Sequence, residues 1–264
     1  GASSVSGLSY TNSPTLTGSD VTDFNIKSGL IDLTSGATSY SSLQSLLGTT
    51  FGNSTLSSAL TSITNPDYRI TASGAFTLDS ALTGGGAVSI KTGGDLAVNS
   101  AVTVGGSKAL TLDSHDNLYV NANLTASGSN AVTLKSADGG SGDYYFALGD
   151  SLSFTGSGAS LNINGEAYTL LYSLSDFSSL EGSTGKFALA KSLDATASSY
   201  TASVVANFGT SSNHTGIFTG LGNTITDLKI TAYYGYTGLF GFNFGTIRDI
   251  GLVGGLIQAD ETGS

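Results

Sequence analysis

Three consecutive stretches of the chain carry the same pattern: ITASGAFTLDSALT (70–83), IKTGGDLAVNSAVT (90–103) and LDSHDNLYVNANLT (112–125). Their starts are 20 and then 22 residues apart, and they align without a gap. Several aligned positions keep one chemical kind of residue, which is typical of a structural repeat. The apolar positions are Ile70, Ile90, Leu112 and, from a fourth copy, Leu134; Phe76, Leu96 and Leu118; Leu78, Val98 and Val120; and Leu82, Val102 and Leu124.

Apolar residues alternate with other residues within each copy, as in LAV at 96–98 and LYV at 118–120. A period of two is typical of a half-buried β-strand. Gly, Ser, Asn or Asp follow each short strand, as turns require, and no copy has room for a crossover helix. The sequence therefore predicts an all-β fold, a parallel β-helix with stacked coils of about 20–22 residues.

A polar position lies among the apolar ones and is filled by Asp79, Asn99 and Asn121. Stacked Asn side chains at a turn form hydrogen bonds along the stack and with nearby backbone. We therefore expect a structural ladder at these three residues. A row of ligands for an ion or a small molecule is the alternative interpretation.

Two similar phrases lie nearer the carboxyl end: HTGIFTGLGNTITDLKIT (214–231) and YTGLFGFNFGTIRDIGLV (236–253). A shift of 22 residues aligns Gly216 with Gly238, Phe218 with Phe240, Thr224 with Thr246, Ile225 with Ile247 and Asp227 with Asp249. We interpret the glycine as a corner with little room for a Cβ atom. The Phe and Ile positions are predicted to fill the interior of a second stack.

These patterns divide the chain into four parts. Residues 1–68 are rich in Ser and Thr, contain the strand-like DFNIKSGLIDLTSG and two Ser-capped helix candidates, and are predicted to cap or abut the first coil. Residues 69–142 are the first β-helix segment. Residues 143–195 are predicted to be a β-rich excursion with a short helix capped by Ser175 and Asp176. Residues 196–264 are the second β-helix segment.

The composition excludes several functional classes. Charged residues make up only 11% and hydrophobic residues 39% of the chain, so a core is expected and disorder is not. A net charge of −10 without a basic patch argues against a nucleic-acid partner, and no apolar run is long enough to insert into a membrane. The absence of Cys excludes disulfides, thiolate metal sites and a Cys nucleophile. No cofactor is expected.

The order of the motifs resembles a known family. Coils with GGDL and HDNL turns, followed by LNINGEAYTLLYSLSDFSSL, GKFALAKSLDAT and GTIRDIGLVGG, resemble filamentous-haemagglutinin-like bacterial exoproteins, and the last phrases are similar to the GLUG repeat of such adhesins. The resemblance spans residues 69–255. It implies a right-handed β-helix, two-partner secretion, an extracellular or cell-surface location, and a role in adhesion or biofilm matrix. It also implies that the chain is an internal or carboxy-terminal section of an exoprotein, or a short relative of one.

Residues that carry chemistry are few. Asp113, His115 and Asp116 are the candidates for catalysis or metal binding, and ordinary turn residues are the simpler interpretation. Asp138 and Asp143 in SADGGSGD are a weak calcium candidate, because carboxylates on a flexible loop are suitable ligands. No acids and base converge in the sequence, so no enzyme is predicted; a β-helix polysaccharide-active enzyme is the alternative.

The densest aromatic cluster contains Tyr233, Tyr234, Tyr236, Phe240, Phe242 and Phe244. These rings are predicted either to pack in the core or to form an exposed surface that stacks on sugars or on a neighbouring subunit. The expected function is a non-catalytic structural or adhesive solenoid. Its open coil ends are predicted to self-associate into filaments or to join neighbouring segments of the same exoprotein. Binding of host or matrix glycans by the aromatic cluster is the alternative.

Overall fold

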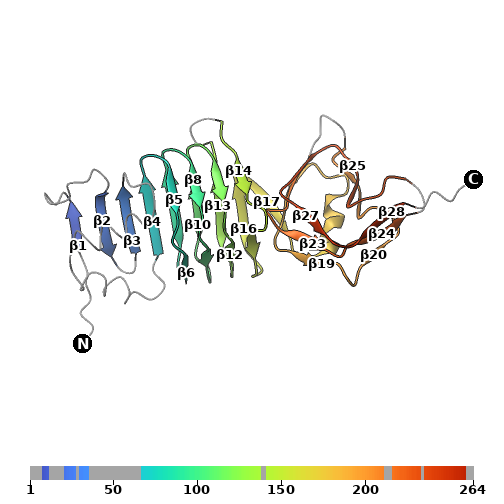
Figure 1. Cartoon of the computed structure of the whole chain (residues 1–264), viewed down its shortest axis with the longest axis horizontal. Coiled ribbons are helices and arrows are strands. Elements are labelled where there is room, and N and C mark those ends of the chain that lie inside the picture. The colour runs from blue at the N-terminus through green and yellow to red at the C-terminus, as the bar shows by residue number, and fades with distance from the viewer. Residues whose placement is uncertain are drawn as a thin grey trace, which may run out of the picture. The chain divides into compact units, whose positions relative to one another are not determined.

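The regular secondary structure of the described residues is almost entirely β-strand, as the alternating apolar pattern predicts (Figure 1). The computed structural model describes residues 67–137, 141–210, 216–232 and 235–259, and the backbone of three earlier strands. Two compact units are present, which we call unit 1 (Gly1–Ala147 and Gly156–Gly165) and unit 2 (Leu148–Thr155 and Glu166–Ser264). Residues 143–195, predicted to be a connecting excursion, contribute strands to both units.

Unit 1 contains three parallel sheets, and successive repeats add successive strands to them (Figure 1). Sheet A includes β4 (Asp67–Ala72), β7 (Val88–Thr92), β10 (Leu110–Asp113), β13 (Ala131–Lys135) and β16 (Ser160–Ile163). Sheet B contains β5 (Phe76–Leu78), β8 (Leu96–Val98), β11 (Leu118–Val120) and β14 (Tyr144–Phe146). Sheet C includes β6 (Leu82–Gly85), β9 (Val102–Val104) and β12 (Leu124–Ala126). The architecture is therefore all-β and solenoid-like.

The strand register of unit 1 confirms the apolar columns. Ile70, Ile90, Leu112 and Leu134 are consecutive partners in sheet A, and their side chains are almost completely buried. The other predicted columns are also in register, namely Phe76, Leu96 and Leu118; Leu78, Val98 and Val120; and Leu82, Val102 and Leu124. The spacing lengthens at the end of sheet A, where Leu134 pairs with Ile163.

Burial and backbone pairing together hold these repeats in place. Burying one Leu or Val side chain contributes roughly 1.5–3 kcal/mol, and each repeat adds several to the same core. The amide of Phe76 donates to the Asp95 carbonyl at 2.9 Å, and the amide of Leu96 donates to the Asn117 carbonyl at 2.9 Å. Because each repeat satisfies the backbone of the one before it, short strands are stable only as part of the stack.

Three strands precede the first repeat: β1 (Leu8–Thr11), β2 (Val21–Lys27) and β3 (Leu30–Ser35). The predicted strand material in DFNIKSGLIDLTSG is confirmed, because it contains β2 and β3 in antiparallel pairing. β1 pairs antiparallel with β2, whereas β3 pairs parallel with β4. The edge of β4 is thus covered. The two helices predicted in this region lie outside the described residues.

The described residues of unit 2 form one short helix and four sets of paired strands. The helix is the 3-10 helix η1 (Leu174–Leu180). The largest set is β17 (Glu166–Leu171), β18 (Lys186–Leu189), β22 (Ile217–Thr219) and β26 (Thr246–Arg248). The next two are β19 (Leu193–Asp194), β23 (Thr224–Thr226) and β27 (Gly251–Val253); and β20 (Ser199–Tyr200), β24 (Lys229–Ala232) and β28 (Leu256–Ala259). β21 (Val205–Phe208) pairs with β25 (Phe240–Asn243), and β15 (Leu152–Phe154) adds two buried apolar residues.

The predicted 22-residue register of the second stack is wrong. Phe218 pairs with Ile247, and Phe240 pairs with Val205. Ile225 pairs with Leu252, which is 27 residues later. Each repeat of unit 2 is longer because it includes an additional wall, formed by β21 and β25. The similar phrases are therefore not consecutive levels of one column but similar strand–turn segments on different walls.

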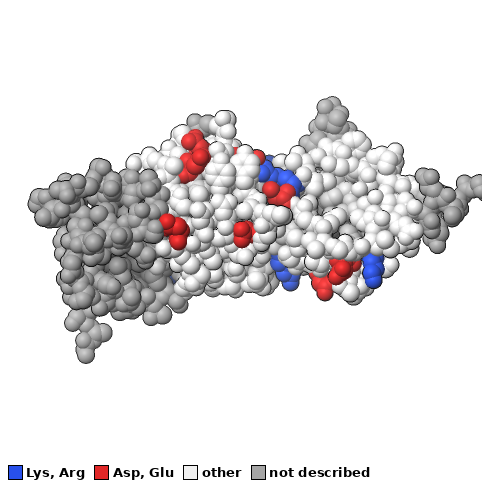
Figure 2. All heavy atoms as spheres, in the orientation of Figure 1, with Lys and Arg blue, Asp and Glu red and all other residues white. Residues whose placement is uncertain are grey.

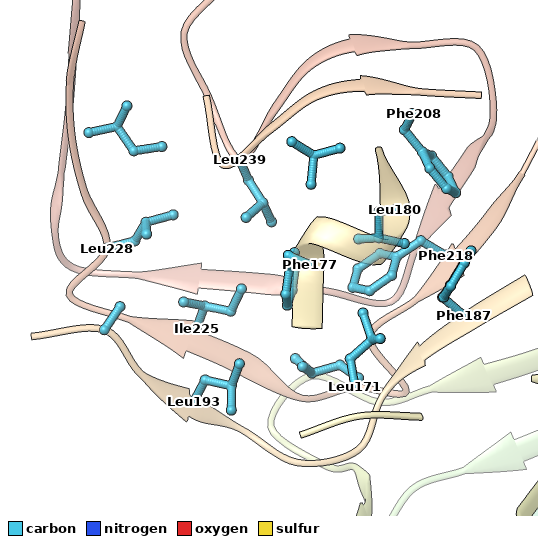
Figure 3. Close-up of a cluster of buried hydrophobic side chains, with 14 residues drawn as sticks. Leu171, Phe177, Leu180, Phe187, Leu193, Phe208, Phe218, Ile225, Leu228 and Leu239 are labelled. Atoms are coloured by element: carbon cyan, nitrogen blue, oxygen red, sulfur yellow. The ribbon is translucent and has the colours of Figure 1, made fainter. Parts of the chain in front are cut away.

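The core of unit 2 lies inside these walls and surrounds η1 (Figure 3). Phe177 and Leu180 from the helix point toward Phe218, and the ring centroids of Phe177 and Phe218 are 5.6 Å apart. The predicted short helix is thus confirmed, but its cap is Ser173 and not Ser175. The Asp176 carboxylate accepts a hydrogen bond from the Ser173 amide at 2.9 Å, which satisfies a donor at the helix start.

Glu181 connects the end of η1 to β21. Its carboxylate accepts hydrogen bonds from the amide of Ala206 at 2.7 Å and from the amide and side chain of Asn207, each at 3.0 Å. Partial burial raises the pKa of Glu181, but the bonds from Asn207 and Ala206 outweigh it and hold the pKa below its usual value of 4.5. The carboxylate therefore stabilises the fold above the unfolded-state pKa, and this contribution is lost as pH falls through the lower folded-state pKa.

We expect Glu181→Gln to lower the stability of unit 2 by about 1 kcal/mol at neutral pH, because a neutral amide offers only one acceptor to these donors. At a pH below the lowered folded-state pKa of Glu181, the two proteins should approach the same stability, because the wild-type carboxyl is then protonated. Urea unfolding at both pH values measures the difference. Glu166→Gln, at an exposed pair with Lys186, is the matched control and should change little. An equal loss for Glu181→Gln at both pH values would contradict the prediction.

Candidate interaction surfaces

A polar ladder runs along one border of sheet B, at the turn after each strand. Asn121 Nδ2 donates to Asn99 Oδ1 at 2.9 Å, and both residues are exposed. Their backbone amides donate to the carbonyls of Val98 and Leu78, both at 2.9 Å. Asp79 occupies the same turn one repeat earlier. We call Asp79, Asn99 and Asn121 the first ladder.

A second ladder lies on the opposite border of sheet B and consists of Asp95, Asn117 and Asp143. Asp95 Oδ1 accepts from the amide of Asn117 at 2.9 Å and from its side chain at 3.1 Å. Asn117 Oδ1 in turn accepts from the amide of Asp143 at 3.1 Å. The alignment of Asp95 with Asn117 was visible in the sequence, but the continuation to Asp143 was not, because the spacing changes there.

The weak calcium candidate is only half described. Asp143 belongs to the second ladder, and its Oδ1 accepts from the amide of Tyr144 at 2.8 Å. Asp138 lies outside the described residues. Within the described part of the chain, no three His, Asp or Glu side chains come together as ligands for a metal ion.

Two tyrosines lie between the ladders on the outer face of sheet B. Tyr119 and Tyr145 are partners in the pairing of β11 with β14, and their rings stack with centroids 5.4 Å apart and planes 17° apart. Sequence reasoning missed this pair. The available signal was an aromatic residue at the outward position of both LYV and YYF.

The predicted aromatic contact surface is partly buried and partly exposed. Phe240 packs on Phe208 and Phe218, with both centroid separations 5.6 Å. Tyr236, Phe242 and Phe244 are exposed, and the rings of Tyr236 and Phe242 meet at 4.1 Å with a tilt of 55°. Tyr233 and Tyr234 lie outside the described residues.

The charged catalytic candidates make ordinary surface pairs. Asp113 Oδ2 lies 3.4 Å from Lys91 Nζ and 3.7 Å from Lys135 Nζ on the neighbouring strands. His115 Nδ1 and Asp116 Oδ1 are 3.0 Å apart, and both side chains are exposed. Figure 2 shows that charged side chains are sparse and scattered on the face in view.

The last repeat of unit 2 exposes apolar side chains. They are Leu252, Val253, Leu256 and Ile257, which we call the apolar end. Leu252 and Ile257 are in register with Ile225 and Ile230, two fully buried core residues. Val253 and Leu256 are in register with Thr226 and Lys229, so the outward positions also become apolar in this repeat.

Comparison with known families, curated proteins and solved structures finds no match to this chain. Among the described residues, no helix has the length and apolar character needed to cross a membrane.

Proposed function

We propose that the chain is a non-catalytic structural solenoid that associates end to end with a second copy of itself. In this proposal both units are parts of a right-handed parallel β-helix, the hand preferred for connections between parallel strands of one sheet. The motif order that resembles filamentous-haemagglutinin-like exoproteins supports an extracellular or cell-surface location and a role in adhesion or biofilm matrix. The ladders and ion pairs support a structural role, because they join the side chains of one repeat to those of the next.

The observation that carries the proposal is the break in burial at the apolar end. Leu252 is 45% exposed and Ile257 is 46% exposed, whereas their partners Ile225 and Ile230 are at 0%. Residues at the same position of the column are thus buried in the core in one repeat and exposed at the surface in the next. Within the described ranges, β27 and β28 are the outermost strands of their sheets. Exposed core positions beside such a strand edge are a template for another strand.

A second copy is the occupant that fits this template. A surface that covers the apolar end must provide strands that pair with β27 and β28, either parallel or antiparallel. It must also provide apolar side chains that are one inter-strand distance away. The apolar end of another copy brings both, and two identical ends meeting about a two-fold axis make a self-complementary interface. If further contacts join the opposite ends of such pairs, the product is a filament.

We expect the purified chain to form larger species as its concentration rises in sedimentation velocity. The double substitution Leu252→Lys and Ile257→Lys should keep it monomeric over the same series, because association would bury unpaired charges. The expected weakening is at least about a hundredfold. Electron microscopy of the larger species then distinguishes closed dimers from filaments.

Leu148→Lys is the matched control, since Leu148 is fully exposed and lies outside the apolar end. It should associate like the wild type. A wild-type chain that sediments as a monomer at every concentration would overturn the proposal, as would equal loss of association in the control.

Carbohydrate binding at Tyr236 and Phe242 is the second candidate function. The exposure of both rings favours it, since aromatic faces stack on sugars. The 55° tilt between the rings offers one ring face at a time and not a continuous platform.

A further inference from the structure

The outer face of sheet B carries a column of side chains whose size changes abruptly. The column consists of Thr77, Ala97, Tyr119 and Tyr145, which are consecutive register partners. The stacked tyrosines fill two adjacent positions, and Tyr145 is 46% exposed. Beside Tyr119 on the other side stands Ala97, with a single methyl group. Neighbouring strands are about 4.8 Å apart, so the next position of the aromatic column lies above Ala97, which carries no ring. We call this the empty position of the column.

Polar groups stand on both sides of this empty position. Asp95 directly precedes β8 and Asn99 directly follows it, and Ala97 projects outward between them because Leu96 and Val98 are fully buried. Asp95 Oδ1 is taken by Asn117, whereas its Oδ2 has no hydrogen-bond partner among the described residues. Asn99 Oδ1 is taken by Asn121, and within the described ranges its Nδ2 has none. An acceptor thus remains at the residue before β8 and a donor at the residue after it, on the two sides of Ala97.

We infer that this notch, formed by Tyr119, Ala97, Asp95 and Asn99, binds a sugar residue of a neutral glycan. The apolar face of a pyranose would occupy the empty position and stack on Tyr119. Its hydroxyl groups would donate to Asp95 Oδ2 and accept from Asn99 Nδ2. The Tyr119 ring, the small Ala97 side chain and the polar groups of Asp95 and Asn99 together form a site for a hydroxylated ring.

The charge of this face selects the class of ligand. The two ladders contribute the carboxylates of Asp79, Asp95 and Asp143, and the outward positions between them on sheet B carry no Lys or Arg. Acidic polysaccharides and nucleic acids would be repelled. A neutral glycan carries no charge and is not repelled. An extended neutral glycan would run along the column of outward residues on sheet B.

Affinity electrophoresis tests the site, with hydroxyethyl cellulose, starch or galactomannan in the native gel and polygalacturonate as the acidic comparison. The wild-type chain should be retarded by at least one neutral polymer and not by polygalacturonate. Tyr119→Ala should reduce this retardation at least about tenfold in apparent affinity. Ala97→Tyr should abolish it while keeping the fold, because a third ring fills the notch and extends the stack.

Leu148→Ala, at a fully exposed side chain that belongs to neither candidate site, is the control and should bind like the wild type. Tyr236→Ala tests the second candidate function, and it should leave binding at the notch in place. Circular dichroism and urea unfolding confirm that each variant is folded. The inference is overturned if no neutral polymer retards the wild type, if polygalacturonate retards it, if Tyr236→Ala abolishes the effect, or if Ala97→Tyr binds as well as the wild type. The Leu252→Lys and Ile257→Lys chain should still bind, so this test is independent of end-to-end association.

Discussion

Gly128→Ala is expected to destabilise unit 1 by at least about 3 kcal/mol. A Cβ atom at this position would overlap the carbonyl oxygen of Gly106, and would lie 2.7 Å from its carbonyl carbon and 2.9 Å from its Cα. These are backbone atoms of the preceding repeat, so they cannot move without disturbing the stack. The next repeat approaches just as closely, because a Cβ on Gly156 would lie 2.8 Å from Gly128 Cα.

Native-state hydrogen exchange, read from peptides that cover β9 and β12, measures this loss within unit 1. Gly74→Ala is the matched control, since it adds the same methyl group where nothing lies within 4 Å. It should change the stability by no more than about 0.5 kcal/mol. Equal exchange in Gly128→Ala and Gly74→Ala would show that the repeats are not packed backbone to backbone at this corner.

Phe218→Ala is expected to lower the stability of unit 2 by about 3–5 kcal/mol. The Phe218 ring is fully buried, and its centroid lies 5.6 Å from those of Phe177 and Phe240. These rings come from β22, η1 and β25, so the substitution leaves a cavity where three elements meet (Figure 3). The helix cannot close this cavity easily because Glu181 fixes its end to β21.

Peptides that cover η1 and β22 should lose most of their protection from hydrogen exchange, whereas those of unit 1 should be unchanged. Phe244→Ala removes the same ring from an exposed position and should cost less than about 1 kcal/mol. If Phe218→Ala and Phe244→Ala exchange alike, the three rings do not form the centre of this core.

The repeats of unit 1 were predictable because their spacing is nearly constant. In a parallel stack, residues one repeat apart lie directly opposite each other. A column of buried side chains therefore appears, when the repeats are aligned, as one position that is apolar in every repeat. Ile90 and Leu112 could be assigned to one column for this reason, and the pairing of β7 with β10 bears this out. The carboxamide column at Asn99 and Asn121 was equally visible.

The strand register predicted for unit 2 was wrong because two similar short sequences adopt the same local conformation without having to be partners in a sheet. TITD at 224–227 and TIRD at 246–249 are both a strand followed by an Asp with a left-handed backbone, at φ 56° and 52°. The first belongs to β23 and the second to β26, on different walls of the core. The same strand-and-turn structure therefore occurs on more than one wall of unit 2. Sequence similarity alone does not show whether two such segments lie on different walls or on the same wall in consecutive repeats.

By itself, the sequence determined the strand period, the apolar columns of unit 1 and the absence of disulfides. Those features depend on which residues alternate and on composition, both of which are properties of the chain. Only the tertiary structure decided that Tyr145 lies beside Tyr119, because the segment between β11 and β14 is longer than a regular repeat and hides the match. It also decided which apolar residues are exposed, since Leu252 follows the same pattern as its register partner, the buried Ile225, but has no further strand over it among the described residues.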